Sequence, residues 1–435
     1  MNPALPNRQR RLKIRKGGVN SKINLLSLGC PRNLVDSQTL AARLKLKGAK
    51  FARCAEKADT VIINTCAFIK EAKEESIDVI LDAIELKKQG RIKKIILSGC
   101  LTQRYPQELI KEFKEIDAIV GRLQLDDSVN SFSLTPKHYS YLKICEGCFN
   151  TCSFCVIPKI KGGFKSRSID SILEEARLLD KKNILELNII GQDITSFGLD
   201  VAAKPLLAQL LSAILKETKN IKWVRLLYLN PLRIDNDLIE LIKENKRVCK
   251  YIDLPIQHAS DRILRLMNRK ITKDKIYSLI KRLRSQIPDV AIRTSVIVGF
   301  PSESEAEFKE LLDFVEEIKF ERLGAFIYSR EEDTEAHDFS GQIPESVKCK
   351  RLDILMRQQQ EIAQGYNASL LNKDMEVLIE EYKDNIYIGR SQSDAPEVDG
   401  CVFVKSKEKL DIGEIVKAKI TQTYEYDLLG EKIPS

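Results

Sequence analysis

Residues 146–158 read Glu146-Gly147-Cys148-Phe149-Asn150-Thr151-Cys152-Ser153-Phe154-Cys155-Val156-Ile157-Pro158. The three cysteines of this segment are spaced by four and then three residues, with no fourth cysteine following at a matching spacing. Three thiolates can bind three irons of a cubane iron–sulfur cluster and leave one iron without a protein ligand. The spacing therefore predicts a cluster with one iron open to a small molecule.

Other uses of these cysteines have less support. Cys145 would complete two CxxC pairs for a four-thiolate zinc site, but structural zinc sites normally separate their pairs by a dozen or more residues, and here three residues intervene. Disulfide frameworks are typical of small secreted chains. Inert packing cysteines would seldom gather three in eight residues. The cluster is the favoured interpretation, with zinc as the alternative.

The composition indicates a multidomain protein. A chain of 435 residues has room for about three domains. No apolar run reaches the length of a bilayer span, and the N-terminus lacks the apolar core of a signal peptide. Eleven cysteines in such a chain are typical of a reducing compartment. We therefore expect a cytoplasmic protein without a membrane partner.

The net charge of +9 is unevenly distributed along the chain. Residues 1–22 carry seven Lys and Arg and no acid. Residues 1–21 are predicted to be a disordered basic tail, which either touches nucleic acid or ribosome or is simply solvated. From residue 368 to 435 there are nine Lys and Arg against fourteen Asp and Glu, a net charge of −5. The C-terminal part is therefore acidic.

Residues 22–133 have the pattern of an open parallel α/β domain. Apolar runs at 23–28, 61–63 and 95–97 predict buried strands, with helices at 34–47 and 71–88 between them. Each strand is followed at once by a cysteine, namely Cys30, Cys66 and Cys100. Because parallel strands end at one edge of a sheet, these thiols should converge as a second group of three. The alternative for any one of them, and the interpretation kept for Cys54, is packing.

Residues 134–367 alternate between strand and helix patterns. Strands are predicted at 141–144, 185–190, 223–228, 251–254, 291–298 and 322–327, with helices at 170–180, 206–216, 235–243, 273–285 and 303–318. Six strand–helix units predict a partial, open parallel barrel with its active site at the C-terminal ends of the strands. The segment containing Cys148 follows the first strand and would lie at that mouth.

Three later loops should lie at the same mouth. Gly191, Gln192 and Gly299 follow predicted strands, and glycine lets a backbone approach a ligand closely, so we expect these residues to contact a cofactor. Both glycines could equally be ordinary turns. His258 could act as an acid or base, but a packing or capping role before Ser260 is the favoured interpretation.

The remaining residues predict a long helix at 346–371 and a small module at 368–435. Short strands at 375–380, 386–389, 401–404 and 415–420 are separated by turn residues. This pattern is typical of a small antiparallel barrel of about five strands, resembling an OB-type binding module.

Together these motifs resemble the radical S-adenosylmethionine methylthiotransferases over nearly the whole chain. The Cys148, Cys152, Cys155 motif is specific to radical enzymes, the trio Cys30, Cys66 and Cys100 to the methylthiotransferase branch, and the acidic end is similar to a TRAM domain. Two subfamilies modify either an isopentenyl adenosine beside the anticodon of transfer RNA or an aspartate of the small-subunit ribosomal protein S-12. The segments 27–37, 253–258 and 394–400 resemble the ribosomal-protein subfamily.

This resemblance implies two 4Fe-4S clusters. The one on Cys148, Cys152 and Cys155 would bind S-adenosylmethionine, which serves both as radical source and as methyl donor, and the one on Cys30, Cys66 and Cys100 would hold the transferred sulfur. The product would be an aspartate methylthiolated at its β-carbon, and no catalytic side chain is assigned beyond the cluster ligands. The resemblance also implies a low-potential electron donor, a monomer, and S-12 as substrate, free or in an assembling ribosome. An acidic C-terminal module suits a basic protein better than RNA.

Overall fold

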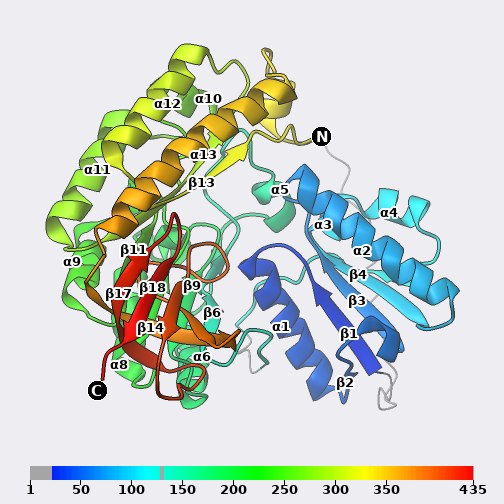
Figure 1. The fold of residues 1–435 in the computed structure, drawn as a ribbon. Coiled ribbons are helices and arrows are strands. Elements are labelled where there is room, and N and C mark those ends of the chain that lie inside the picture. Colours follow the sequence, from blue (N-terminus) through cyan, green and yellow to red (C-terminus); the bar gives the residue numbers. More distant parts are fainter. Residues whose placement is uncertain (1–21, 128–131, 435) are drawn as a thin grey trace.

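The computed structural model describes residues 22–127 and 132–434, and the predicted basic tail at 1–21 lies outside this range. The described chain forms an N-terminal α/β unit, a central unit built on a second parallel sheet, and a small C-terminal barrel (Figure 1). This arrangement confirms the predicted fold class. The domain boundaries after residues 133 and 367 stay a prediction.

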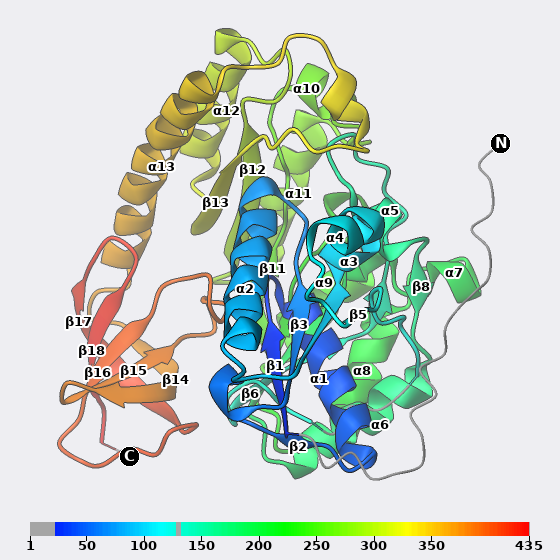
Figure 2. The same cartoon turned by 90° about the vertical axis from the view of Figure 1, so that its right-hand side faces the viewer.

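The N-terminal unit is a five-stranded parallel sheet in the order β2-β1-β3-β4-β5. The helix α1 (Pro31–Leu46) lies between this sheet and the central unit, and α2 (Lys70–Lys88) covers the far side (Figures 1 and 2). The strands are β1 (Lys22–Ser27), β2 (Lys50–Phe51), β3 (Thr60–Thr65), β4 (Lys94–Gly99) and β5 (Ala118–Ile119). The central strand β3 is buried along its whole length, as its run of β-branched residues predicts.

The central unit is an open barrel of six parallel strands in the order β6-β9-β10-β11-β12-β13. The strands are β6 (Tyr139–Lys143), β9 (Glu186–Ile190), β10 (Trp223–Leu226), β11 (Val248–Asp253), β12 (Ala291–Val298) and β13 (Arg322–Ile327). The outer helices are α6 (Ile169–Lys181), α8 (Leu207–Glu217), α9 (Asn236–Glu244), α11 (Lys273–Gln286) and α12 (Glu305–Ile318). The six predicted strand–helix units are confirmed, with end points shifted by a few residues.

Local sequence signals explain where these helices begin and which face they bury. The carboxylate of Asp235 accepts from the backbone N–H of Leu238 at the start of α9. At the start of α12, Ser304 and Glu307 form a reciprocal capping box. Apolar residues on the inner faces of the outer helices pack on the strands and form the largest buried core of the described chain. The barrel is therefore a rigid support for the loops at its mouth.

The helix α13 (Glu345–Ala368) leads to a closed five-stranded barrel in the order β14-β15-β16-β18-β17 (Figure 2). Its strands are β14 (Asp374–Lys383), β15 (Ile386–Arg390), β16 (Val402–Lys405), β17 (Ile415–Thr423) and β18 (Leu428–Lys432). The prediction of a small barrel is confirmed. One difference is that β16 and β18 pair in parallel, because the last hairpin closes the barrel against β16.

Buried ion pairs hold the C-terminal barrel against the concave side of the central sheet. The Arg225 guanidinium donates to Glu186 at 2.7 Å, and Arg390 of β15 pairs with the same carboxylate. In a neighbouring contact, Arg322 donates to Asp394 at 2.7 Å. These contacts place the segment after β15 near the N-terminal ends of the barrel strands. The C-terminal ends of the strands are therefore left for the site.

Short elements of the chain were not predicted. They are the helices α3 (Cys100–Arg104), α4 (Pro106–Glu112), α5 (Ile157–Lys161), α7 (Leu199–Ala202) and α10 (Asp261–Leu266), and the strands β2, β5, β7 (Cys145–Glu146), β8 (Lys165–Ser166) and β18. Among the described residues, no single helix is long and apolar enough to cross a membrane. The two helical segments Ile194–Ala202 and Leu207–Glu217 are apolar enough together, but they meet at an angle of 105°.

Candidate functional site

The first group of three cysteines lies where neighbouring strands of the N-terminal sheet end. Cys30 precedes α1 after β1, Cys66 directly follows β3, and Cys100 begins α3 after β4. These strands are adjacent in the sheet and parallel. The three loops lie side by side as predicted, since Gly29, before Cys30, approaches Cys66 and Gly99, before Cys100, approaches Thr65.

Glycines bring the three loops close together. Gly29 has a φ of +80°, and a Cβ atom there would lie 2.6 Å from the Sγ of Cys66. Gly99 has a φ of +101°, and a Cβ atom there would lie 2.4 Å from the backbone oxygen of Thr65. At both positions a side chain would be strained and would collide with the neighbouring loop. A glycine is therefore needed before Cys30 and before Cys100, because any other residue would keep the neighbouring loops apart.

Two asparagines tie the same loops together. Asn33 donates to the backbone oxygen of Leu28 at 2.7 Å and to that of Asn64 at 3.1 Å. In return, the side chain of Asn64 donates to the backbone oxygen of Asn33 at 2.8 Å. Buried hydrogen bonds between loops of this kind hold the loops in one geometry, although the Oδ1 of Asn33 has no partner among the described residues. The thiols are thus positioned before any ligand binds.

The surroundings shift the pKa of the thiols in this group in different directions. Burial opposes ionisation of Cys30, but the guanidinium of Arg32 and the backbone N–H of Asn33 hold its pKa below the usual value. Burial raises the pKa of Cys100 to about 12, and the nearby thiols of Cys66 and Cys30 repel its charge. A coordinating cation overcomes such a shift, because a metal-bound thiol loses its proton outright. The group is suited to hold cations.

The second group of three cysteines lies in the loop between β7 and α5. Asn150 fixes Cys148, since its backbone N–H and side-chain amide lie 3.4 Å and 3.2 Å from the Sγ. The backbone N–H of Cys155 donates to the oxygen of Cys152 at 3.0 Å. Burial raises the pKa of Cys155 to about 12, with repulsion from Cys152 and Cys148. The three thiols thus lie in one short loop, and their role as cluster ligands stays a prediction.

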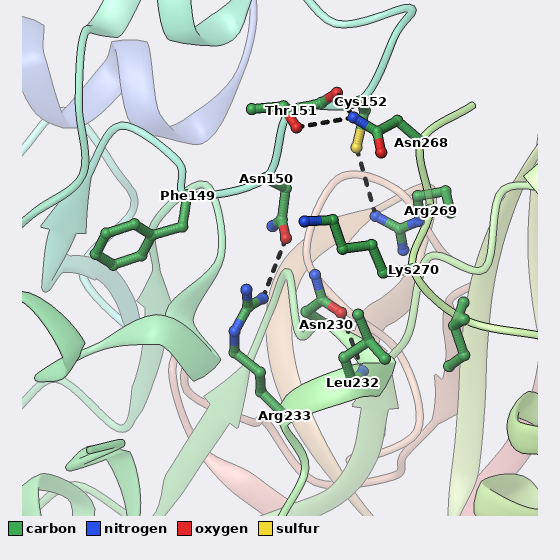
Figure 3. Close-up of a pocket in the computed structure, with 11 residues that line it drawn as sticks. Phe149, Asn150, Thr151, Cys152, Asn230, Leu232, Arg233, Asn268, Arg269 and Lys270 are labelled. Carbon is green, nitrogen blue, oxygen red and sulfur yellow. Dashed lines mark hydrogen bonds between the residues drawn. The ribbon is translucent and has the colours of Figure 1, made fainter. Parts of the chain in front are cut away.

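A small pocket that is open to solvent adjoins this loop (Figure 3). Its lining includes Asn150, Cys152, Arg233, Arg269 and Lys270. One end of the Arg269 guanidinium lies 3.9 Å from the Cys152 Sγ, and the other donates to the oxygen of Pro255 at 2.7 Å. Figure 3 shows the side chains of Lys270, Arg233 and Asn150 directed toward one another. The space beside Cys152 is therefore polar and cationic.

The predicted cofactor contacts lie at the ends of barrel strands. The Oε1 of Gln192 is buried without a hydrogen-bond partner among the described residues, so it can accept from a bound amine. A Cβ atom on Gly191 would lie 2.4 Å from the Sγ of Cys145, and one on Gly299 the same distance from Lys348. Packing therefore explains both glycines, and their contact with a cofactor stays a prediction.

Cys145 and His258 are both buried and contribute to packing. The Cys145 thiol is fully buried and donates to the backbone oxygen of Asp193 at 3.7 Å. His258 is fully buried, and its Nδ1 accepts from the backbone N–H of Ser260 at 2.9 Å. The packing and capping interpretation of His258 is confirmed.

Two residues that the sequence did not single out join the two groups of cysteines. Arg32, next to Cys30, donates to the backbone oxygen of Gly191 at the barrel mouth at 3.3 Å. Lys161, at the end of α5, lies 2.9 Å from Asp36 of α1, and its charge acts on Cys30 and Cys100. In the sequence, the only signal for Arg32 and Lys161 is that each is a basic residue close to a group of cysteines. The two groups thus face each other across the junction of the two units.

The two groups of cysteines suit an iron–sulfur cluster better than a single metal ion. Within residues 22–127 and 132–434, no three His, Cys, Asp or Glu side chains are close enough to hold a single metal ion. A cubane cluster takes its three thiolates on three different irons, so its ligands stand farther apart than those of one ion. Two converging all-thiol groups, each supported by a neighbouring arginine, fit that chemistry.

Comparison with known proteins is consistent with this geometry. Residues 22–121 match the family described as uncharacterized protein family UPF0004, residues 142–315 the radical SAM superfamily, and residues 373–433 the TRAM domain. The ribosomal protein uS12 methylthiotransferase RimO of Clostridioides difficile is 46% identical, over 94% of this chain and 98% of that protein. The chain belongs to the ribosomal protein uS12 methylthiotransferase family. The same-named protein of Geotalea uraniireducens is 42% identical, over 96% of this chain and 99% of its own length.

Both groups of cysteines lie within regions that match known families. The UPF0004 match includes Cys30, Cys66 and Cys100, and the radical SAM match includes Cys148, Cys152 and Cys155. Among solved structures, the radical S-adenosylmethionine methyltransferase TsrM of Kitasatospora setae shares the fold, with a TM-score of 0.54 and 14% identity over 72% of this chain and 76% of that chain. The protein is therefore a radical S-adenosylmethionine enzyme of the methylthiotransferase class.

Proposed function

We propose that this protein replaces a hydrogen on the β-carbon of an aspartate in ribosomal protein uS12 with a methylthio group. The observation that carries the proposal is the pair of three-cysteine groups facing each other, in a chain whose relatives of matching length are uS12 methylthiotransferases. The same relatives favour this substrate over transfer RNA. The net charge of −5 of residues 368–435 also suits a basic protein partner.

The six cysteines are assigned as ligands of two 4Fe-4S clusters. Cys148, Cys152 and Cys155 hold the cluster that binds S-adenosylmethionine, and Cys30, Cys66 and Cys100 hold the second. When bound, these groups supply a radical able to take an unreactive hydrogen from carbon, a place for the transferred sulfur, and a methyl group from a further S-adenosylmethionine. No side-chain acid or base can remove such a hydrogen, so the protein supplies position and surroundings.

Residues of the chain have definite tasks in this proposal. The unpartnered Oε1 of Gln192 accepts from the methionyl ammonium of S-adenosylmethionine. Asn150 and Arg269 hydrogen-bond the Sγ atoms of Cys148 and Cys152 and so tune the first cluster. Asn33 and Asn64 hold the loops of Cys30, Cys66 and Cys100 in place, so these thiols would bind their cluster without a rearrangement of the chain. Because the two clusters would lie close together, the sulfur need not come from a donor that diffuses in from solution.

The reaction has further requirements. The radical step needs one electron from a low-potential donor, which we expect to be a separate cytoplasmic reductant. We propose that the enzyme acts as a monomer in the cytoplasm, on uS12 either free or within an assembling small subunit. A two-site chain of this kind needs no second copy to complete the reaction.

The substrate assay tests this function directly. Protein reconstituted with iron and sulfide without oxygen is incubated with S-adenosylmethionine, a strong reductant and either uS12 or transfer RNA. Mass spectrometry should find one methylthio group in place of hydrogen on a uS12 aspartate and none on the RNA. Modification of transfer RNA instead, or of neither substrate, would contradict the proposal.

A further inference from the structure

Arg32 lies where the N-terminal unit meets the barrel mouth. Its guanidinium is 4.4 Å from the ring centroid of Tyr228, and its Nη1 donates to the oxygen of Gly191 at 3.3 Å. Gly191 follows β9 and Tyr228 follows β10, so two neighbouring strand ends support one cation. The guanidinium is therefore held in a fixed place at the mouth.

The supporting residue Tyr228 has an unusual backbone. Its φ is +65°, which is rare for a large aromatic residue, and its backbone N–H donates to Asp253 at 2.8 Å. Strain of this kind persists only where the surroundings enforce it, and it is concentrated at functional sites. The backbone strain at Tyr228 is thus linked to the position of its ring against Arg32.

The position of Arg32 relates it to both groups of cysteines. Its charge interacts with Cys30 and Cys100 of the N-terminal group and with Cys155 of the other. In the proposed reaction, the target carbon loses its hydrogen beside one group and receives sulfur from the other. The carbon must therefore lie between them, within reach of Arg32.

Arg32 also differs from other arginines near the mouth in its partners. Arg233 lies 2.9 Å from Asp193 and Arg293 lies 3.2 Å from Asp253, so each is neutralised by a carboxylate. In the part of the chain that the structure describes, Arg32 has no carboxylate within 4.0 Å, and its side chain is only partly buried. The acidic neighbour of Arg32 is instead the thiol of Cys30, which accepts a hydrogen bond from the guanidinium. A guanidinium has five N–H groups, so those not directed at Cys30 and Gly191 can bind a carboxylate through two parallel hydrogen bonds.

We propose that Arg32 binds the side-chain carboxylate of the target aspartate and so selects aspartate as the residue to be modified. The inference rests on the proposed function and names the group that recognises its substrate. The carboxylate carbon is bonded to the reacting β-carbon, so fixing the carboxylate also fixes that carbon between the two groups of cysteines. An asparagine has no charge to offer and fills only one of the two acceptor positions, so it binds less well.

The test compares two substrates in four proteins, one of which is a control. Wild-type enzyme, Arg32→Gln and Arg32→Lys are assayed with uS12 and with uS12 in which the modified aspartate is asparagine. The expected result is that kcat/KM of Arg32→Gln for uS12 falls by about 10- to 100-fold, with little change for the asparagine substrate. Arg32→Lys keeps the charge and should recover part of the preference for aspartate. Arg91→Gln, an exposed arginine of the same unit, is the matched control.

Two further measurements separate the possible failures. Iron content and S-adenosylmethionine cleavage without uS12 are measured for Arg32→Gln as well, so that kcat/KM is compared per cluster-loaded chain and a loss of cluster is told apart from a loss of aspartate recognition. If the variant modifies uS12 with the wild-type preference for aspartate, or if both substrates decline equally, the role of Arg32 is refuted while the proposed function stands. If wild-type enzyme leaves uS12 unmodified, the proposed function itself fails.

Discussion

The ammonium group of Lys161 lies 2.9 Å from the carboxylate of Asp36, and both side chains are buried. Lys161 ends the helix that follows Cys155, and Asp36 belongs to the helix that begins after Cys30. Lys143 and Glu146 complete the network around this pair. The ion pair therefore fixes the two groups of cysteines relative to each other.

Replacing Lys161 with Met should destabilise the protein markedly. Without Lys161, the buried carboxylate of Asp36 keeps only Lys143 as a cationic partner, and the loss costs up to about 3–5 kcal/mol. Thermal unfolding of the metal-free protein should show a lower midpoint than for Lys159→Met, an exposed position on the same helix. Equal midpoints for the two variants would show that the pair does not hold the units together.

Replacing Gly99 with Ala should prevent only one cluster from forming. The new Cβ atom would lie 2.4 Å from the backbone oxygen of Thr65 and would push apart the loops of Cys66 and Cys100. Iron per chain should fall to about half, with S-adenosylmethionine cleavage retained. Gly48→Ala is the matched control, because Gly48 also has a positive φ but no atom within 4 Å of the new Cβ. Full iron content in Gly99→Ala would refute this account of the glycine.

The two groups of cysteines should have separable roles. Cys152→Ala removes a ligand of the cluster that binds S-adenosylmethionine, so cleavage to deoxyadenosine should be lost. Cys66→Ala should spare cleavage and abolish methylthio transfer, because the sulfur-bearing cluster lacks a ligand. Chromatography of deoxyadenosine and mass spectrometry of uS12 measure the two activities. Loss of both activities in Cys66→Ala, in protein that keeps half its iron, would show that the sites are not independent.

Glu186 should make docking of the C-terminal barrel sensitive to acid. Burial opposes its ionisation, but Arg390 and Arg225 hold its pKa at about 2. Glutamate in an unfolded chain titrates near about 4.3, so the unfolded state takes up the proton first as the pH falls. The stabilisation, about 3 kcal/mol, is complete above that value and is lost as the pH falls toward 2.

The measurement is the thermal midpoint between about pH 6 and pH 3. Glu186→Gln should have a lower midpoint at neutral pH and a shallower decline in acid than the wild type. Glu74→Gln, at an exposed position, should decline as the wild type does. An unchanged acid slope in Glu186→Gln would mean that other carboxylates carry the effect.

Much of this site follows from sequence patterns of short range. The convergence of Cys30, Cys66 and Cys100 could be predicted because parallel strands end at one edge of a sheet. The role of Arg32 could not, since Gly191 lies 159 residues away and no local pattern pairs a loop of one unit with a strand end of another. The two-residue strands β2 and β5 were missed for a similar reason, because they exist only by pairing with β1 and β4.

Counting iron and acid-labile sulfide in protein reconstituted without oxygen tests the two-cluster assignment most directly. Two cubane clusters on six cysteines predict about eight iron atoms and about eight sulfides per chain, with a brown absorbance. Cys152→Ala and Cys66→Ala should each lose about half of that iron. About four irons per wild-type chain, or a colourless protein that binds zinc, would contradict the account.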